Sequence, residues 1–262
     1  DFSYSISANI ATNNNKITNL AGSDNMIQNA GDNVRWILKE GESIGSFYGL
    51  KTDGLYTQEE IDAGRYYIYG RHPKAGDLKY VPQREGVKYY CDLEKGEPEV
   101  NASITDDDRT IIGKDVPDFT YGINISLQWK NWELSAFGQG VSGTSVGFES
   151  EQVFAFMLNS NPRKYHLQRW NEENPNPNAA VPRLYGGTSL DEYNKHFSDN
   201  QLFDSDYFRI KTLSLGYMVP RNVVTKWGLS SLKFFLTGEN LFTLRADKIM
   251  KDFDPEKDLP KK

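Results

Sequence analysis

Residues 119–140 alternate apolar and polar side chains almost without interruption. From Phe119 to Trp129 every odd-numbered residue is aromatic or aliphatic, and every residue between them is polar or glycine. After Lys130 and Asn131 the apolar parity resumes at Trp132. A repeat of two places successive side chains on opposite faces of a β-strand. The segment therefore predicts two long strands joined by a tight turn, with one apolar face.

Similar strand-like segments recur along the chain, and the connections between them alternate in length. They are found at residues 2–10, 16–20, 34–39, 43–56, 119–129, 132–140, 207–220 and 232–244. Short turns and long polar stretches such as 57–118 and 141–205 follow one another between these segments. Up-and-down transmembrane barrels have short turns on one side and long loops on the other. Strand alternation by itself leaves a barrel and a soluble β-sandwich equally open.

Composition excludes several classes of protein. The formal net charge of -6 over 262 residues gives no electrostatic basis for binding nucleic acid. Cys91 is the only cysteine, so an intramolecular disulfide is impossible. No stretch approaches the ~18 consecutive apolar residues of a membrane helix. The first ten residues read as a strand in progress and not as a signal peptide, so we expect a piece of a longer protein.

Four blocks of sequence resemble the C-terminal barrel of SusC/RagA-type TonB-dependent outer-membrane transporters. They are "GESIGSFYGLKTDGLY" (41–56), the block from "DDDRTIIGKD" to "FGQGVSG" (106–143), "YFRIKTLSLGYMVP" (207–220) and "LSSLKFFLTGENLFTL" (229–244). The blocks occur in the family's order and at plausible spacing. Several long blocks in order are more specific than one short motif.

The resemblance implies an all-β fold, an antiparallel up-and-down transmembrane β-barrel segment with long extracellular loops. We expect about eight strands in this chain, as part of a larger barrel. Residues 1–262 would form the C-terminal portion of that barrel, with the plug domain and signal peptide outside this chain. The expected location is the Gram-negative outer membrane, with the loops facing the exterior.

The same resemblance implies a function in nutrient import. Such transporters take up oligosaccharides, or in some members peptides, together with a SusD-like surface lipoprotein. They draw energy from the TonB complex through an N-terminal part that this chain does not include. Outer-membrane lipid is the remaining expected partner, and no cofactor or enzymatic activity is expected. The alternative is a soluble, surface-exposed β-sandwich that binds glycans or acts as an adhesin.

Asp106, Asp107 and Asp108 are weak candidates for a metal site. Members of the resembled family often carry a calcium-loop-like run before this block, but here the alternating ligands and central glycine are missing. A Ca²⁺ site needs six to eight oxygen ligands, and three adjacent Asp side chains do not all point inward. A solvated acidic turn, partly neutralised by Arg109, is the preferred interpretation.

The best enzyme hypothesis rests on residues 143–147, which match the G-x-S-x-G nucleophile elbow around Ser145. Asp191 and His196 follow in the order of an α/β-hydrolase triad. Such a hydrolase needs a parallel sheet with crossover helices, whereas this chain predicts antiparallel neighbours with tight turns. The sequence therefore favours a protein that is not an enzyme.

Two aromatic-rich loop segments are candidates for contact with substrate or partner. The first contains Tyr66, Tyr67 and Tyr69, and the second contains Arg169, Trp170 and Asn171. Sugar rings stack on flat aromatic faces, and protein interfaces favour Tyr, Trp and Arg. Ordinary loop packing is the competing interpretation for both segments. Trp170 is the strongest single candidate.

The barrel interpretation makes two predictions about geometry. The face carrying Ile123, Ile125 and Leu127 should meet lipid, and the opposite parity should point into a polar lumen. The long loops 57–118 and 141–205 should lie on one side of the sheet, opposite the turns at 12–15, 40–43 and 130–131.

Overall fold

A computed structural model of the chain describes residues 2–30, 34–63, 67–68, 70–87, 103–148, 154–156, 161–185, 193–247 and 253–256. The chain divides into two compact units. Unit 1 contains residues 1–14, 116–145 and 204–262, and unit 2 contains residues 15–115 and 146–203. No helix in the described ranges is both long enough and apolar enough to span a membrane.

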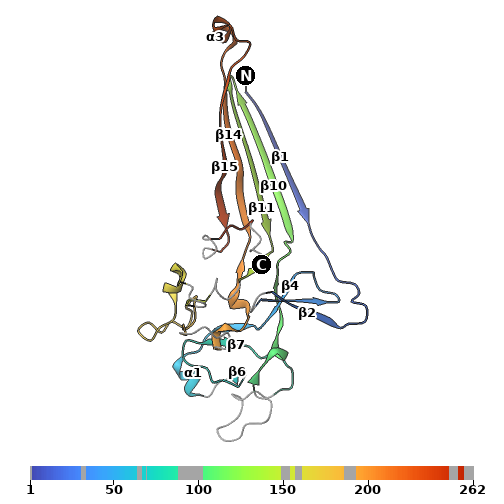
Figure 1. The fold of residues 1–262 in the computed structure, drawn as a ribbon, viewed down its shortest axis with the longest axis vertical. Helices are drawn as coiled ribbons and strands as arrows, with labels where there is room; N and C mark the ends of the chain where they lie inside the picture. Colours follow the sequence, from blue (N-terminus) through green and yellow to red (C-terminus); the bar gives the residue numbers. More distant parts are fainter. Residues whose placement is uncertain are drawn as a thin grey trace. The chain divides into compact units, whose positions relative to one another are not determined.

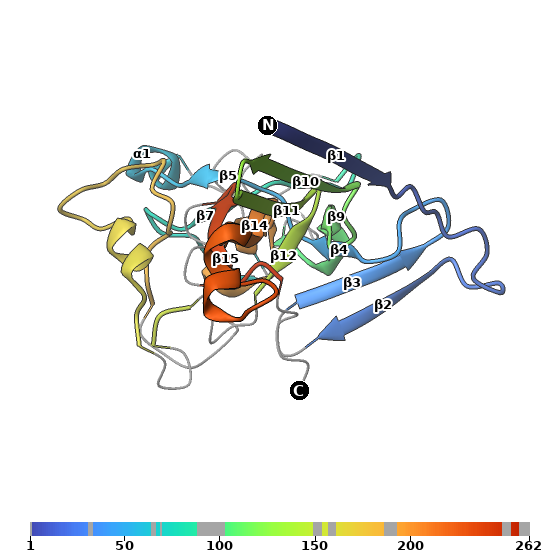
Figure 2. The same cartoon turned by 90° about the horizontal axis from the view of Figure 1, so that it is seen from above.

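Unit 1 is built around one antiparallel sheet of five long strands, which lie side by side in Figure 1. In spatial order they are β1 (Phe2–Thr12), β10 (Phe119–Trp129), β11 (Trp132–Ser142), β14 (Tyr207–Met218) and β15 (Lys233–Arg245). Figure 2 looks along the strands and shows the same succession. Each strand has 11 to 13 residues, slightly longer than the ~9–11 residues that cross a bilayer at a tilt.

The hairpin predicted from residues 119–140 is confirmed. β10 pairs with β11 from Phe119–Ser142 to Trp129–Trp132 without a register shift. The two-residue turn places Lys130 at φ 53°, in the left-handed region. Hairpin turns of this length require positive φ because the twist of the turn must match that of the strands. A one-residue slip would exchange the two faces, so the apolar pattern fixes the register.

The connectivity differs from the prediction in one respect. The chain leaves β1 at Thr12 and enters β10 at Phe119, and these two residues are register partners at one end of the sheet. The turn at 12–15 therefore starts the long excursion 13–118, at the same end as the excursion 143–206, and does not lie opposite the long loops. The turn at 130–131 lies at the opposite end, as expected.

Fewer segments join the long-stranded sheet than the sequence predicts. Residues 16–20 form no strand, and the segments expected at 34–39 and 43–56 belong to smaller sheets of unit 2. The described part of the long-stranded sheet contains five strands instead of about eight. The fold class itself is confirmed: the chain is all-β, antiparallel and up-and-down in unit 1.

Unit 2 contains short strands in small sheets. A four-stranded sheet has the order β2 (Asn25–Ala30), β3 (Val34–Lys39), β4 (Ser46–Gly49) and β9 (Thr110–Lys114). Two pairs are formed by β5 (Thr52–Leu55) with β7 (Leu78–Tyr80), and by β6 (Tyr67–Ile68) with β8 (Ser103–Ile104). A further pair joins β12 (Ser145–Gly147) to β13 (Leu202–Asp204).

The described helices are all short. They are α1 (Gln58–Asp62), α3 (Arg221–Val224) and the 3₁₀ helices η2 (Asp106–Asp108), η4 (Lys164–Gln168), η5 (Tyr193–Lys195), η6 (Asp199–Gln201) and η7 (Thr225–Trp227). Thr57 begins α1 with a capping box, in which its hydroxyl and the Glu60 carboxylate satisfy each other's backbone N–H groups. α3 and η7 lie in the connection between β14 and β15.

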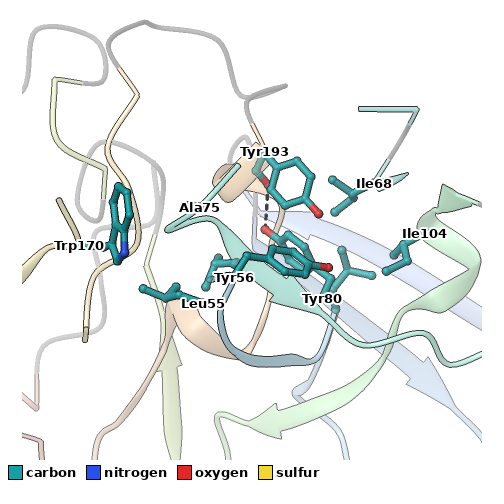
Figure 3. Close-up of a cluster of buried hydrophobic side chains, with 10 residues drawn as sticks. Leu55, Tyr56, Ile68, Ala75, Tyr80, Ile104, Trp170 and Tyr193 are labelled. Carbon is teal, nitrogen blue, oxygen red and sulfur yellow. Dashed lines mark hydrogen bonds between the residues drawn. The ribbon is translucent and has the colours of Figure 1, made fainter. Parts of the chain in front are cut away.

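Unit 2 has a buried core of its own, rich in tyrosine. Figure 3 shows Tyr56, Tyr80 and Tyr193 converging with aliphatic side chains. The Tyr80 hydroxyl donates a 3.0 Å hydrogen bond to the carbonyl of Tyr193, so its polar end is satisfied inside the core. A second cluster consists of Val34, Phe47 and Phe197.

Candidate functional site

The most extensive functional feature of unit 1 is the apolar face of the long-stranded sheet. The register places residues of one parity in rows across all five strands. Two of these rows are Phe2–Trp129–Trp132–Tyr217–Phe234 and Tyr4–Leu127–Leu134–Leu215–Leu236. Apolar residues thus meet in register across all five strands, and they produce one continuous apolar surface.

Much of this apolar surface is exposed. Large side chains at its two edge strands lie open, as at Ile6 and Ile10 on β1, and Leu236 on β15 is 76% exposed. Soluble monomers rarely expose contiguous apolar patches of more than a few hundred Å². A soluble sandwich would cover this face with a second sheet, and such exposure is therefore evidence against that alternative.

The opposite face of the same sheet is mainly polar, although Phe137 and Phe235 also belong to it. One row runs through Ser5, Ser126, Ser135, Ser214 and Thr237, and the last two hydroxyls are 2.9 Å apart in a hydrogen bond. Nearer the short-turn end, Lys233 and Glu133 form an ion pair. The sheet thus has one apolar face and one mainly polar face.

Aromatic residues gather at both ends of the apolar face. At the short-turn end, the rings of Trp132 and Tyr217 lie 4.7 Å apart, and the Lys130 ammonium lies 5.1 Å from the ring of Trp129. At the other end, the rings of Tyr121 and Phe208 are stacked with centroids 6.1 Å apart. Outer-membrane barrels carry such aromatic girdles where the hydrocarbon band meets the headgroups.

Two glycines of β11 make room for the stacked pair. A Cβ at Gly138 would lie 2.4 Å from the Phe208 ring. A Cβ at Gly140 would lie 2.6 Å from the Tyr121 ring and 2.5 Å from the carbonyl oxygen of Tyr207. Glycine in a strand often marks a close approach of this kind.

We expect Gly140→Ala to destabilise the barrel by about 1–3 kcal/mol, the usual cost of overpacking. The clash at Gly140 involves a backbone oxygen, so relief requires separating β11 from β14. Gly216→Ala is the matched control, because the only close contact of its Cβ would be with the flexible end of Lys233, at 2.9 Å. The urea midpoint of the full-length barrel measures the effect. Equal midpoints for the two variants would contradict the proposed packing role.

The three aspartates considered as metal ligands are engaged in structural contacts. Asp106 pairs with both Arg35 and Arg109, at 3.1 and 2.8 Å. Asp108 is fully buried and its carboxylate accepts hydrogen bonds from the Arg84 side chain and from backbone N–H groups. Within the described ranges, no group of three or more His, Cys, Asp or Glu residues is arranged to hold a metal ion.

The candidate contact residues are placed as follows. Tyr66 and Tyr69 lie outside the described residues, and the backbone of Tyr67 pairs with Ser103. Trp170 is only 6% exposed, with the Arg183 guanidinium 5.3 Å from its ring.

Trp170 packs against the backbone of Gly76, where a Cβ would lie 2.2 Å from the indole. Its neighbour Arg169 forms a backbone bridge with Val181, and the Asn171 side chain accepts from the N–H of Asn174. A contact role for these residues stays a prediction, and in this structure Trp170 supports the loop from within.

A buried carboxylate that the sequence did not reveal organises the same loops. Asp77 accepts hydrogen bonds from the Tyr185 hydroxyl, the Asn194 side chain and the N–H of Lys74, at 2.7 to 3.0 Å. Burial raises the pKa of Asp77 above its ordinary value, and these hydrogen bonds act in the opposite direction. Burial likewise raises the pKa of Tyr193. No local pattern marks Asp77, because its side-chain partners Tyr185 and Asn194 come from distant loops.

The hydrolase hypothesis gains no support from the geometry. Ser145 is the first residue of strand β12. Asp191 lies outside the described residues. The nucleophile elbow requires a sharp strand-to-helix turn.

Curated sequences similar to this chain are TonB-dependent receptors. The chain is 31% identical over 249 residues to TonB-dependent receptor P3 of Formosa agariphila and 28% identical over 265 residues to TonB-dependent receptor P26 of the same organism. These matches cover 93% and 98% of this chain, but the chain spans only 22% and 24% of the two relatives. No family model matches the chain.

Solved structures of similar fold include RagAB peptide importers. The structure of the RagAB peptide transporter matches with a TM-score of 0.65, and the open-open state of the RagAB peptide importer with 0.63. Sequence identities are 22% and 21%, and each match covers 95% of this chain and 24% of that chain. These likenesses show the fold.

Proposed function

We propose that this chain, which is a segment of a SusC/RagA-type TonB-dependent receptor, forms part of the wall of an importer in the outer membrane. The observation that carries the proposal is the sheet with one apolar and one polar face, continuous across five strands. In this arrangement the apolar face meets lipid and the polar face lines the transport path. The chain contributes the C-terminal portion of the barrel.

The orientation follows from the lengths of the connections. Both long excursions, 13–118 and 143–206, begin and end at the same end of the strands, the end that contains Thr12 and Phe119. Outer-membrane barrels place long loops outside and short turns on the periplasmic side. We therefore assign this end of the strands to the cell exterior, and the Lys130–Asn131 turn to the periplasm.

The cargo and partners are proposed from the family. The importer takes up oligosaccharides or peptides with a SusD-like surface lipoprotein, and the TonB complex drives it through a part of the protein outside this chain. The peptide importers of similar fold support the peptide class, whereas the aromatic loops 65–73 and 164–177 are compatible with glycan. No step breaks a covalent bond.

Deletion of the gene is expected to abolish growth on one oligosaccharide or oligopeptide as sole carbon source, and the full-length gene should restore it. Tagged transporter from the restored strain should co-purify a surface lipoprotein in mild detergent. Growth of the deletion strain on every tested glycan and peptide would exclude import of these classes. Purification without any lipoprotein would exclude the proposed partner.

A further inference from the structure

One part of the polar face is covered by a segment of the chain itself. Elsewhere on this face, residues such as Ser126 and Asn124 are exposed. Arg209 of β14 belongs to the same face, since it pairs with Gln139 and Thr243 in the register, yet it is only 5% exposed. The difference in exposure identifies a covered patch on the wall.

The cover is residues 253–256, which we call the acidic segment. Asp254 accepts from one terminal nitrogen of Arg209 at 2.7 Å, and Glu256 accepts from the other at 2.8 Å. Lys211 also donates to the carboxylate of Glu256. The remaining guanidinium donor, Nε, bonds the Thr243 hydroxyl at 2.9 Å.

A local irregularity of β14 brings the two cations together. Lys211 is skipped in the register with β11, where Ile210 pairs with Gly138 and Thr212 with Phe137. The register with β15 shifts at the same point, and Asn240 opposite it has φ 52°. Such bulges re-aim side chains. Here Arg209 and Lys211 both reach the carboxylate of Glu256.

The charge balance makes the contact depend on both sides. Two cations of the wall meet two carboxylates of the acidic segment. A buried guanidinium is tolerated only while it is paired and hydrogen-bonded. The carboxylates of Asp254 and Glu256 are partly exposed, so water already reaches them, whereas the Arg209 guanidinium is buried and depends on these two partners. Loss of the carboxylate charges should therefore favour separation, because water can then reach Arg209.

We propose that the acidic segment is a movable cover on the lumen wall, held closed by Arg209 and Lys211, and that its release widens the transport path at this level. The inference rests on the proposed function, because the polar face borders a path only in an importer. The cover lies near the end of the sheet assigned to the exterior, since Arg209 is the third residue of β14. It is thus placed to act at cargo entry or release.

The test measures the exposure of a cysteine beside Arg209. Gln139→Cys is introduced into the full-length transporter, with Cys91 replaced by serine, and the purified protein is treated with a charged maleimide. Combining Asp254→Asn with Glu256→Gln should accelerate labelling about tenfold, which corresponds to about 1.4 kcal/mol in the free energy of opening. Glu133→Gln, which breaks another ion pair of the same face, should leave the rate unchanged.

A second measurement needs no change to the acidic segment. Molar salt screens partly buried ion pairs only weakly, so it should accelerate labelling at position 139, relative to a reference cysteine at Ser126, by less than the neutralising substitutions do. The neutralised variant should show no such acceleration. Equal labelling rates with and without Asp254 and Glu256, in barrels that migrate as folded protein, would overturn the proposal. Because labelling requires neither cargo nor uptake, this result is distinct from a failure of the import function.

Discussion

Ile125→Arg in the full-length transporter is expected to lower the amount of assembled barrel in the outer membrane, whereas Ser126→Arg is expected to leave it near the wild-type level. Ile125 is at the middle of β10, between Ile6 and Ala136 on the apolar face. Arginine at the midplane of a bilayer costs about 2–4 kcal/mol, and a lumen-facing position avoids this cost. The heat-modifiable band in outer-membrane fractions measures assembled barrel.

A companion pair separates the effect of lipid from the effect of packing. Leu236 is 76% exposed, so arginine there would be harmless in water and costly only against hydrocarbon. Thr237 lies next to it on the polar face, as the partner of Ser214. Leu236→Arg should therefore reduce assembly and Thr237→Arg should not. Equal tolerance of arginine on both faces would mean that the apolar face does not meet lipid.

The faces of the sheet could be predicted from the sequence because their signal is local. A repeat of two depends only on neighbouring residues, and in β1, β10 and β11 it places the apolar residues on the same face. The bulge of β14 at Lys211, where the alternation of apolar and polar residues shifts by one, was not predicted. A bulge adds one residue without changing the composition of the strand.

The membership of the sheet could not be read in the same way. Residues 34–39 have the composition of a strand, and they do form β3, but they pair within the smaller sheet of unit 2. Local alternation identifies a strand and does not identify its partner. The pairing of β1 with β10 bridges the whole excursion 13–118, and this contact leaves no mark in either segment alone.

Burial of the loop residues also depends on distant partners. The sequence made Trp170 the strongest contact candidate, but Gly76 offers a surface without a side chain on which the indole packs. The same holds for Asp108. In the sequence it is one of three equivalent aspartates, and in the structure it alone of the three is fully buried.

Asp108→Ala is expected to loosen unit 2, whereas Asp107→Ala should have little effect. The Asp108 carboxylate accepts from the Arg84 guanidinium at 2.8 Å and from the N–H groups of Gln83 and Thr105 at 3.0 Å. Breaking a fully buried pair costs about 3–5 kcal/mol, and the cost is lower here because the Arg84 side chain is 24% exposed. Asp107 is 78% exposed and 3.8 Å from Arg84.

Limited proteolysis of the purified transporter measures the loosening, because cleavage follows the population of locally opened states. Asp108→Ala should be cut faster within residues 15–115, with Asp107→Ala matching the wild type. A chelator is the third arm of the experiment. If Asp106, Asp107 and Asp108 held a metal, EDTA would accelerate cleavage of the wild type as much as the alanine does. Because arginine and backbone N–H groups already neutralise Asp108, we expect EDTA to leave the cleavage rate of the wild type unchanged. Equal cleavage rates for the two alanine variants would contradict the structural role of Asp108.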